Sequence, residues 1–354
     1  SVSVLILLLT ILVMSTAQAR PQPAAAADFA EKQAAWEKHE ELVASSPYGG
    51  LEWRSVGPVV QGGRLVDMEV VPGQPYTFYA AYASGGLWKT TNNGHTFEPL
   101  FDDKATLIMG DIAVDPNHPE TVWVGTGENN SSRSSYGGMG IYRSDDGGQN
   151  WSYMGLGDTD RIGRILIDPN DSNTVYVAAL GKLYTPGGQR GIFRTTDGGK
   201  NWQQILKGGD WTGVIDMVVK PDDAKTLYAA AWERKRRPWD FSEGGTGSAV
   251  YKSVDGGDTW SRLEGGLPRG EHVGRIGLAV SASSPDTLYA SIDNQQQLPE
   301  SQWDLGDRPV NAKRLRNMSK EEVLAQEKNE IEGFIRISDF DVIIDADKLI
   351  DWVK

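Results

Sequence analysis

The sequence predicts an all-β protein made of repeated four-stranded antiparallel units, and three observations support this. Its 354 residues include 41 Gly, 12 Trp and 12 Tyr, a composition typical of short strands joined by tight turns. A short motif of hydroxyl, acidic, glycine and aromatic residues recurs four times. Between the motifs, alternating apolar runs are separated by turns rich in Pro, Asn and Asp, such as VDPNHPE and IDPNDSN.

The chain begins with an apolar run, VLILLLTILVM, followed by small residues that end at Ala17-Gln18-Ala19. A run of this length before an A-x-A site predicts a secretory signal at 1–19, cleaved after Ala19. The alternative is an N-terminal membrane anchor, but the run is short for a span. We therefore expect a secreted, periplasmic or cell-surface protein with no membrane span in the mature chain. Residues 20–50 are expected to form an Ala/Pro-rich linker and then a helix around DFAEKQAAWEKHEELV, packed on the outside.

Composition excludes several kinds of chemistry. The chain has no Cys, which removes disulfides, thiol catalysis and Cys-based zinc sites. A net charge of −13 argues against a nucleic-acid partner. The four His residues lack metal-ligand spacing, and the sequence contains neither a phosphate loop nor a nucleophile elbow. We expect no metal and no cofactor.

The recurrent motif occurs as TTNNGHTF, SDDGGQNW, TTDGGKNW and SVDGGDTW, starting at residues 90, 144, 195 and 253. In each copy the acidic and hydroxyl side chains can bind backbone N–H groups across a tight turn, and a glycine supplies a positive φ. The aromatic residue then starts the returning strand and packs in the core. We therefore expect a structural role for these motif residues: Asn92, Gly94, Phe97, Asp146, Gly148, Trp151, Asp197, Gly199, Trp202, Asp255, Gly257 and Trp260.

A second repeated position lies between the motifs. Asp67, Asp111, Arg164, Asp216 and Gly277 each precede an aromatic residue by 12 positions, with a turn in between. Each unit of about 50 residues therefore contains four antiparallel strands, as a blade of a β-propeller requires, whereas a linear β-solenoid has shorter repeats. We predict a partial propeller over residues 51–298, with four full blades and the start of a fifth at 275–293.

Residues 53–293 resemble the Asp-box (BNR-repeat) β-propellers, a group that includes sortilin-type receptor domains, xyloglucanase-type glycosidases, sialidases and the photosystem II assembly factor. The opening LEWRSVGPVVQGGR, running into ASGGLWKTTNNG, is most similar to bacterial secreted proteins described as sortilin-like or glycosyl-hydrolase-like. The resemblance implies a helical insertion within a blade for residues 299–354, where Ser319 and Glu322 have the spacing of a capping box. An independent helical tail is the alternative.

Binding residues are expected on the loops that join the second and third strands of each blade, opposite the motif turns. These loops span 125–139, 180–191 and 231–248, and they place aromatic residues beside charged ones, which suits a glycan or protein ligand. The candidates are Tyr136, Arg164, Tyr184, Trp232, Arg234, Arg236 and Trp239. Alternatively, the aromatics only cover blade edges. For Arg164, the alternative to a binding role is that it only neutralises the acidic residues at the same repeat position of other blades.

Glycoside hydrolysis requires two carboxylates that flank the scissile bond. Where the xyloglucanase-type family carries an Asp before paired glycines, this chain has Ala83-Ser84-Gly85-Gly86. Arg64, Arg164 and Arg275 are loosely spaced candidates for a sialidase-like arginine clamp, but the sialidase Arg-Ile-Pro motif is absent. The weak catalytic candidates are Glu128, Glu233 and Asp240. We therefore predict a sortilin-like protein- or glycan-binding module, with a xyloglucanase- or sialidase-like hydrolase as the alternative and a purely structural protein as a third hypothesis.

Overall fold

A computed structural model describes residues 28–51, 62–131, 135–237, 239–296, 310, 312–337 and 344–354. The chain divides into two compact units, Ser1–Gln295 and Gln296–Lys354. The predicted signal at 1–19 lies outside the described residues, as does the start of the linker at 20–27.

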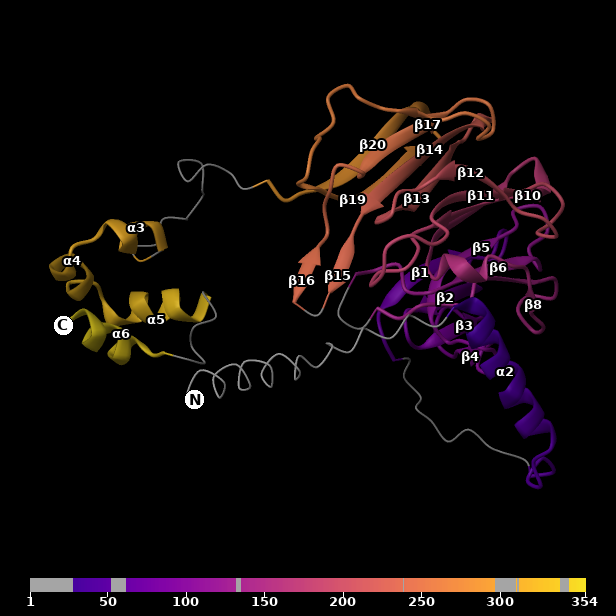
Figure 1. The fold of residues 1–354 in the computed structure, drawn as a ribbon, viewed down its shortest axis with the longest axis horizontal. Helices are drawn as coiled ribbons and strands as arrows, with labels where there is room; N and C mark the ends of the chain where they lie inside the picture. The colour runs from indigo at the N-terminus through magenta and orange to yellow at the C-terminus, as the bar shows by residue number, and fades with distance from the viewer. Residues whose placement is uncertain are drawn as a thin grey trace, which may run out of the picture. The chain divides into compact units, whose positions relative to one another are not determined.

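The first unit contains four four-stranded antiparallel sheets whose strands follow one another in chain order (Figure 1). The first sheet consists of β1 (Leu65–Val70), β2 (Phe78–Tyr82), β3 (Gly86–Thr90) and β4 (Glu98–Pro99). The second consists of β5 (Met109–Val114), β6 (Val122–Thr126), β7 (Ile141–Ser144) and β8 (Ser152–Tyr153). The third consists of β9 (Ile162–Asp168), β10 (Asp171–Ala179), β11 (Gly191–Thr195) and β12 (Gln203–Lys207).

The fourth sheet consists of β13 (Thr212–Lys220), β14 (Asp223–Glu233), β17 (Ala249–Ser253) and β18 (Ser261–Arg262). A two-stranded sheet follows, made of β19 (Val273–Ser281) and β20 (Ser284–Asn294). The prediction of an all-β propeller with four blades and the start of a fifth is confirmed.

One of the predicted loops differs from the structure that is observed. Residues 231–248 begin inside β14, which extends to Glu233, and then form a separate hairpin of β15 (Lys235–Arg237) and β16 (Asp240–Ser242). The strand is longer than expected because Ala231 and Trp232 continue the pairing with β13, opposite Val214 and Gly213.

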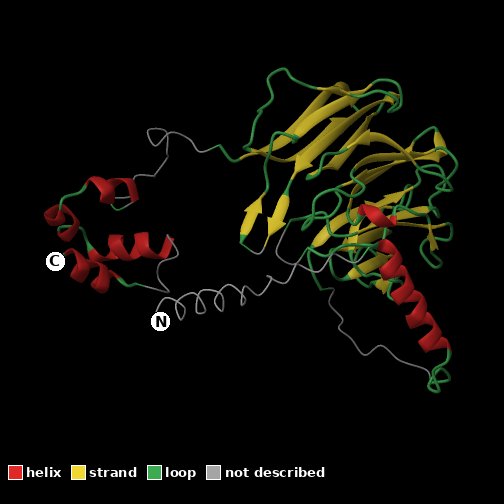
Figure 2. Ribbon diagram, in the orientation of Figure 1, coloured by secondary structure: helices red, strands yellow, loops and turns green. Residues whose placement is uncertain are grey.

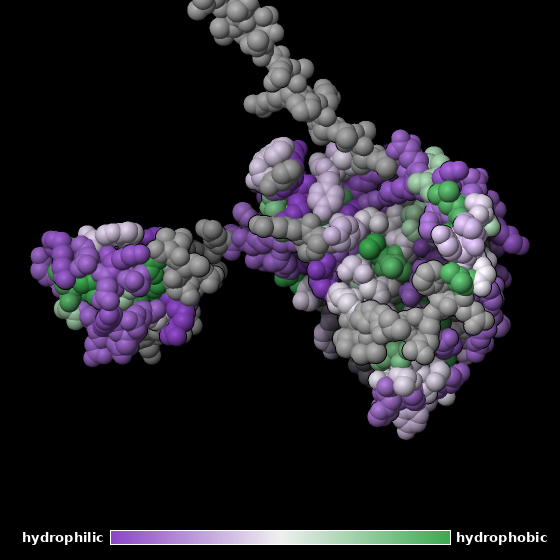
Figure 3. Space-filling view, turned by 90° about the horizontal axis from the view of Figure 1, so that it is seen from below, coloured by the Kyte–Doolittle hydropathy of each residue, from purple (hydrophilic) through white to green (hydrophobic). Residues whose placement is uncertain are grey.

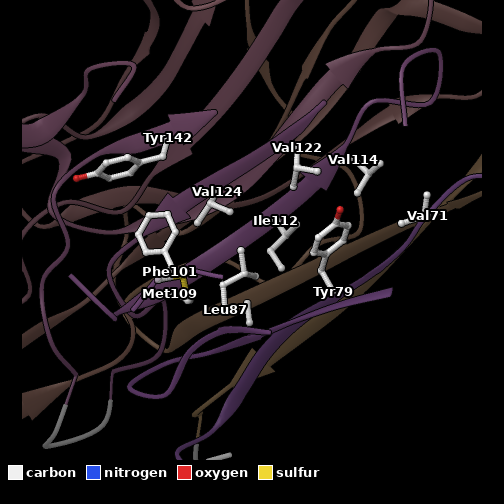
Figure 4. Packing of buried hydrophobic residues seen from close by; sticks show 11 residues of the cluster. Val71, Tyr79, Leu87, Phe101, Met109, Ile112, Val114, Val122, Val124 and Tyr142 are labelled. Atoms are coloured by element: carbon white, nitrogen blue, oxygen red, sulfur yellow. The ribbon is translucent and has the colours of Figure 1, made fainter. Parts of the chain in front are cut away.

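Apolar clusters fill the spaces between consecutive blades. The cluster between the first and second blades is drawn in Figure 4, where Leu87 and Tyr79 of the first blade lie near Ile112, Val122 and Val124 of the second. Similar clusters lie between the second and third blades and between the third and fourth. A further cluster joins the fourth blade to β19 and β20. Burial of apolar surface between sheets is therefore the main force that holds the blades together.

The repeated motif forms the expected hydrogen-bonded turn. In the third copy, Thr195 Oγ1 donates to Asp197 Oδ1 over 2.8 Å, and the same carboxylate oxygen accepts the N–H of Asn201 over 2.9 Å. The N–H of Gly199, at φ +91°, donates to Thr195 Oγ1 over 2.9 Å. Trp202 Nε1 donates to the carbonyl of Met154 in the preceding blade over 2.7 Å. The turn is thus a side-chain staple whose aromatic residue also ties two blades together.

Helix α2 (Phe29–Ala44) begins after the N-cap Asp28 and confirms the expected N-terminal helix. None of its residues is fully buried, and it contacts the second blade near its start. The ring of Phe29 stacks on Tyr153, with ring centroids 5.5 Å apart. Lys32 forms an ion pair with Asp160 over 3.0 Å. Two side chains of its first turn therefore anchor this helix.

The described part of the second unit is helical (Figure 2). It contains α3 (Ala312–Asn317), α4 (Lys320–Leu324), α5 (Lys328–Ile337) and α6 (Ala346–Val353). Ser319 and Glu322 form the predicted capping box at the start of α4. Ile331 and Ile335 of α5 pack with Ala346 in a small apolar core. Across the described residues, none of the helices has the length and apolar character that spanning a bilayer requires.

Candidate functional site

The loops at one end of the second and third blades enclose a cavity of about 550 Å³. Its walls come from residues 135–137 of the second blade, residues 160–161 before β9, and residues 182–185 of the third blade. Ile108 and Lys32 complete the lining. The cavity therefore lies where loops between strands two and three meet a loop between blades, on the face predicted to carry the site. On the face drawn in Figure 3, apolar residues of the propeller unit are scattered in small patches among hydrophilic ones.

Arg161 and Asp160 form the charged part of the lining. Arg161 is only 2% exposed, and its Nη1 donates to the carboxylate of Asp160. Its Nη2 donates to the carbonyl of Ser135 over 2.8 Å, whereas its Nε has no hydrogen-bond partner in the described part of the chain. Burial lowers the pKa of Arg161, and the charge of Asp160 acts in the opposite direction. The guanidinium is therefore held rigidly in a poorly solvated place.

Two predicted binding residues, Tyr136 and Tyr184, supply the aromatic part of the lining. Their exposed fractions are 54% and 46%, so both rings remain accessible. The hydroxyl of Tyr184 donates to the carbonyl of Ser135 over 3.2 Å, and the guanidinium of Arg161 lies 5.7 Å from its ring centroid. These contacts position the ring of Tyr184 before a ligand arrives.

Lys32 brings helix α2 to the cavity. Its Nζ contacts Asp160 Oδ1 at 3.0 Å and the carbonyl of Gly138 at 3.3 Å. On another wall lies Lys182, whose side chain makes no ion pair with any residue that the structure describes. The cavity therefore combines two accessible aromatic rings with ionic groups of both signs.

Three further predicted residues lie outside the cavity lining, and two of them connect the second blade to the fourth. Trp232 is 2% exposed, and its Nε1 donates to the carbonyl of Glu243 over 2.7 Å. Arg234 Nη1 donates to the carbonyls of Asn129 and Asn130 over 3.0 and 2.8 Å. Arg236 Nη1 donates to the carbonyl of Ser131 over 2.9 Å. Arg234 and Arg236 therefore hold the loop of the second blade against the fourth, whereas the contact of Trp232 stays within the fourth blade.

Trp239 lies on the β15–β16 hairpin and is 79% exposed. Beside it in the hairpin, the guanidinium of Arg236 lies 4.1 Å from the ring centroid of Phe241. Trp239 does not line the described cavity, so the structure does not bring it together with Tyr136 and Tyr184.

Arg164 lies between carboxylates of the neighbouring blades. Its Nη1 is 3.3 Å from Asp111 Oδ1, and its Nε donates to Asp216 Oδ1 over 3.0 Å. Burial raises the pKa of Asp111 well above its ordinary value, and the charge of Arg164 opposes this. Arg164 therefore satisfies carboxylates of the inner strands, which was the alternative to a role in binding.

The three weak catalytic candidates are spread over different places. Glu128 is fully buried, and its Oε1 accepts from Arg64 Nε over 2.8 Å. Glu233 Oε2 accepts the N–H of Gly247 over 2.8 Å, and Asp240 is exposed on the hairpin. None of the three is part of the lining of the described cavity.

The candidates for an arginine clamp are also held by protein groups. Arg64 is paired with Glu128, and Arg275 Nη1 donates to Asn130 Oδ1 over 2.9 Å while its guanidinium lies 5.7 Å from the ring centroid of Trp232. Together with Arg164, they contact three different sets of partners. The described residues do not form a common clamp from them.

Sequence reasoning missed Asp160 and Arg161. The available signal was their position: they precede the inner strand of the third blade, and such inter-blade loops share a face with the loops between strands two and three. An ionisable pair in this segment could therefore have been included among the candidates. Asp160 has a positive φ of +58°, which non-glycine residues seldom adopt, although Asp adopts it more often than most of them.

Comparisons with known proteins agree with the fold. The family model for Sortilin-Vps10, described as sortilin, neurotensin receptor 3, matches residues 139–348. A xyloglucanase from Paenibacillus sp is 23% identical over 254 residues, which cover 64% of this chain and 23% of that protein. Xyloglucanase Xgh74A from Acetivibrio thermocellus is 29% identical over 264 residues, which cover 65% and 28%. The chain thus spans about a quarter of the length of these relatives.

Two solved structures are similar over part of their length. The GH74 enzyme from Niastella koreensis gives a TM-score of 0.47 at 18% identity, covering 64% of this chain and 35% of that one. The GH74 xyloglucanase from Xanthomonas campestris gives a TM-score of 0.46 at 18% identity, covering 68% and 37%. The family model covers more than half of the 354 residues. The chain therefore belongs to the Sortilin-Vps10 family and is a sortilin-like, glycosyl-hydrolase-like propeller.

Proposed function

We propose that the cavity between the second and third blades binds a carbohydrate chain without hydrolysing it. The observation that carries this proposal is the pair of accessible rings, Tyr136 and Tyr184, on opposite loops of one cavity that also contains Asp160 and Arg161. Aromatic faces pack against the apolar C–H faces of sugar rings, while charged and polar groups bind the hydroxyls.

The names of the relatives support a carbohydrate over a peptide ligand. Both curated relatives are named xyloglucanases, so the ligand named there is a polysaccharide. The volume of about 550 Å³ lies within the range of small-ligand pockets and suits a few sugar units. The signal predicted at 1–19 is consistent with a ligand outside the cytoplasm.

The ionic groups of the cavity support binding over hydrolysis. Hydrolysis of a glycosidic bond generally needs two carboxylates about 5–9.5 Å apart. Among the described lining residues Asp160 is the single carboxylate, and it is engaged by Arg161 and Lys32. One carboxylate supplies half of the pair that this reaction generally uses. The cavity therefore fits a recognition site better than a catalytic one.

The test is titration calorimetry of the protein with xyloglucan oligosaccharides. We expect binding that Tyr184→Ala and Tyr136→Ala each weaken by about tenfold, in line with the loss of one aromatic contact. Tyr289→Ala is the matched control, since Tyr289 is 59% exposed on β20 and outside the cavity lining. Melting curves check that each variant is folded.

Three outcomes would overturn the proposal. Equal affinity in both cavity variants and in the control would place the ligand elsewhere, and failure to bind any neutral or acidic oligosaccharide would remove the carbohydrate altogether. Release of reducing sugar that is lost in Glu128→Gln, Glu233→Gln or Asp240→Asn would make the protein a hydrolase.

A further inference from the structure

Cations outnumber carboxylates around the cavity. Lys32, Arg161 and Lys182 line it, against the single carboxylate of Asp160 among the described lining residues. This local excess is opposite in sign to the net charge of the whole chain, which is −13. A positively charged pocket on a negatively charged protein concentrates negatively charged ligands.

More positive charge lies buried behind Arg161. Arg190 is 2% exposed, and its guanidinium donates to backbone carbonyls such as that of Leu180, over 2.6 Å. Burial lowers the pKa of Arg190 to about 10, and the charge of Arg161 acts in the same direction. Carbonyl groups satisfy hydrogen bonds but carry no full negative charge, so the positive charge of Arg190 is offset in part by the more distant carboxylates of Asp160 and Asp210.

Arg234 extends this group. It is 1% exposed, and its Nε and Nη2 have no hydrogen-bond partner among the residues that the structure describes, although its Nη1 donates to two carbonyls. Burial lowers its pKa well below the ordinary value, and the charges of Arg161 and Arg190 add to the effect. Buried guanidinium groups with free donors are costly unless an anion lies nearby.

The two carboxylates whose charges act on Arg161 are already engaged. Asp160 pairs with Arg161 and Lys32, and Glu128, whose charge also acts on Arg161, is paired with Arg64. The side chain of Lys182 makes no ion pair with any residue that the structure describes. An anion in the cavity would therefore meet Lys182 directly and the field of the buried arginines behind the lining.

We propose that the carbohydrate bound in this cavity is an acidic one, whose sugar units carry a carboxylate as uronic acids do. The inference rests on the proposed function and adds the chemical class of the ligand. Lys182 contacts the carboxylate, Arg161 and the arginines behind it supply the attractive field, and Tyr136 and Tyr184 pack on the sugar rings.

The test compares two oligosaccharides that differ at one carbon of each sugar unit. Cellohexaose and the hexamer of β-1,4-linked glucuronic acid share their linkage and ring geometry, and only the second carries carboxylates at C6. Calorimetry at low ionic strength is expected to give about tenfold tighter binding of the uronate, with the preference shrinking as salt is added. Lys182→Gln is expected to weaken uronate binding about fivefold more than cellohexaose binding, whereas Lys182→Arg retains the preference.

Lys225→Gln is the control for net charge. Lys225 is exposed, and its carbonyl accepts the N–H of Gly256 in a motif turn, away from the cavity. If Lys182→Gln and Lys225→Gln weaken uronate binding equally, the attraction is general and the assignment of Lys182 is wrong.

The two proposals fail in different ways. Equal affinity for both hexamers, lost in Tyr184→Ala, would keep the carbohydrate site and overturn its acidic preference. Binding of neither these hexamers nor xyloglucan oligosaccharides would overturn the proposed function and this inference with it.

Discussion

The carboxylate of Asp111 in β5 accepts the backbone N–H of Ile165 in β9 at Oδ2, over 2.6 Å, and so joins the inner strands of the second and third blades. The same contact occurs between Asp67 and Ile112, over 3.1 Å, and between Asp216 and Leu278, over 2.8 Å. In each case the residue that donates its N–H comes directly after the repeat position in the inner strand of the next blade. These repeat positions are Asp111, Arg164 and Gly277. The acids that recur in the sequence are therefore staples between inner strands.

Removing this staple should destabilise the propeller. Asp111 is 2% exposed, and Asp111→Ala leaves the N–H of Ile165 without its acceptor and Arg164 without one of its carboxylates. We expect a loss of about 2–4 kcal/mol in the free energy of unfolding, measured by urea denaturation. Asp222→Ala, which removes an exposed partner of Lys220, should cost less than about 1 kcal/mol. Equal costs for the two variants would contradict the role of Asp111.

Glu69 should make stability depend on pH near neutrality. Burial, with a smaller contribution from Asp67, raises its pKa from 4.5 to about 7, so the folded state binds this proton more tightly than the unfolded chain. Stability therefore falls as pH rises from about 4.5 to about 7. Glu69→Gln should gain about 1–2 kcal/mol at pH 8 and almost nothing at pH 4.5. Urea denaturation at both values checks this, and a gain independent of pH would refute it.

The motif turns should matter for stability and not for ligand binding. Hydrogen bonds from the side chain and N–H of Asn201 lower the pKa of Asp197 to about 2 from its ordinary 3.8. The contribution of this carboxylate to the stability of the folded protein is thus present above about pH 3.8 and lost as pH falls through about 2. Asp197→Ala should lower the melting temperature by a few degrees at pH 7, with a smaller difference at pH 2.5. Saccharide affinity should stay unchanged, and a large drop would mean that the turn belongs to the site.

Helix α2 should detach when its anchor is removed. Phe29→Ala eliminates the stacking on Tyr153, and none of the residues of the helix is fully buried. We expect faster hydrogen–deuterium exchange throughout Phe29–Ala44, with little change in the melting temperature of the sheets. Trp36→Ala is a suitable control, since the ring of Trp36 contacts His39 of the same helix. Unchanged exchange in Phe29→Ala would show that other contacts hold the helix.

Periodicity made the blades predictable. The motif at Asp146 and its copies defines one turn per unit, and the position of Asp111 defines the inner strand, so strand number and order follow from spacing. The end of β14 was not predictable in this way, because Trp232 continues the strand through pairing with Gly213 of another segment. Local composition suggested a loop, and tertiary pairing overrode it.

The candidate site was only partly predictable. Tyr136 and Tyr184 were found because long loops on a rigid scaffold favour binding residues. The same argument predicted Arg234 as a binding residue, but its guanidinium is buried and donates to the carbonyl of Asn129. These two residues lie 105 positions apart, so the sequence does not show the contact. Asp160 and Arg161 precede the repeat position at Arg164, so their place in the repeat was the sequence signal for them, but their contact with the cavity follows from the three-dimensional arrangement.

The most direct test of the central claim is hydrogen–deuterium exchange with and without a bound oligosaccharide. Ligand binding at the proposed cavity should slow exchange in the peptides that carry residues 135–137, 160–161 and 182–185, which line it. The β15–β16 hairpin at residues 235–242 serves as the internal comparison because it carries the exposed Trp239. Protection confined to that hairpin, with the cavity peptides unchanged, would contradict the account.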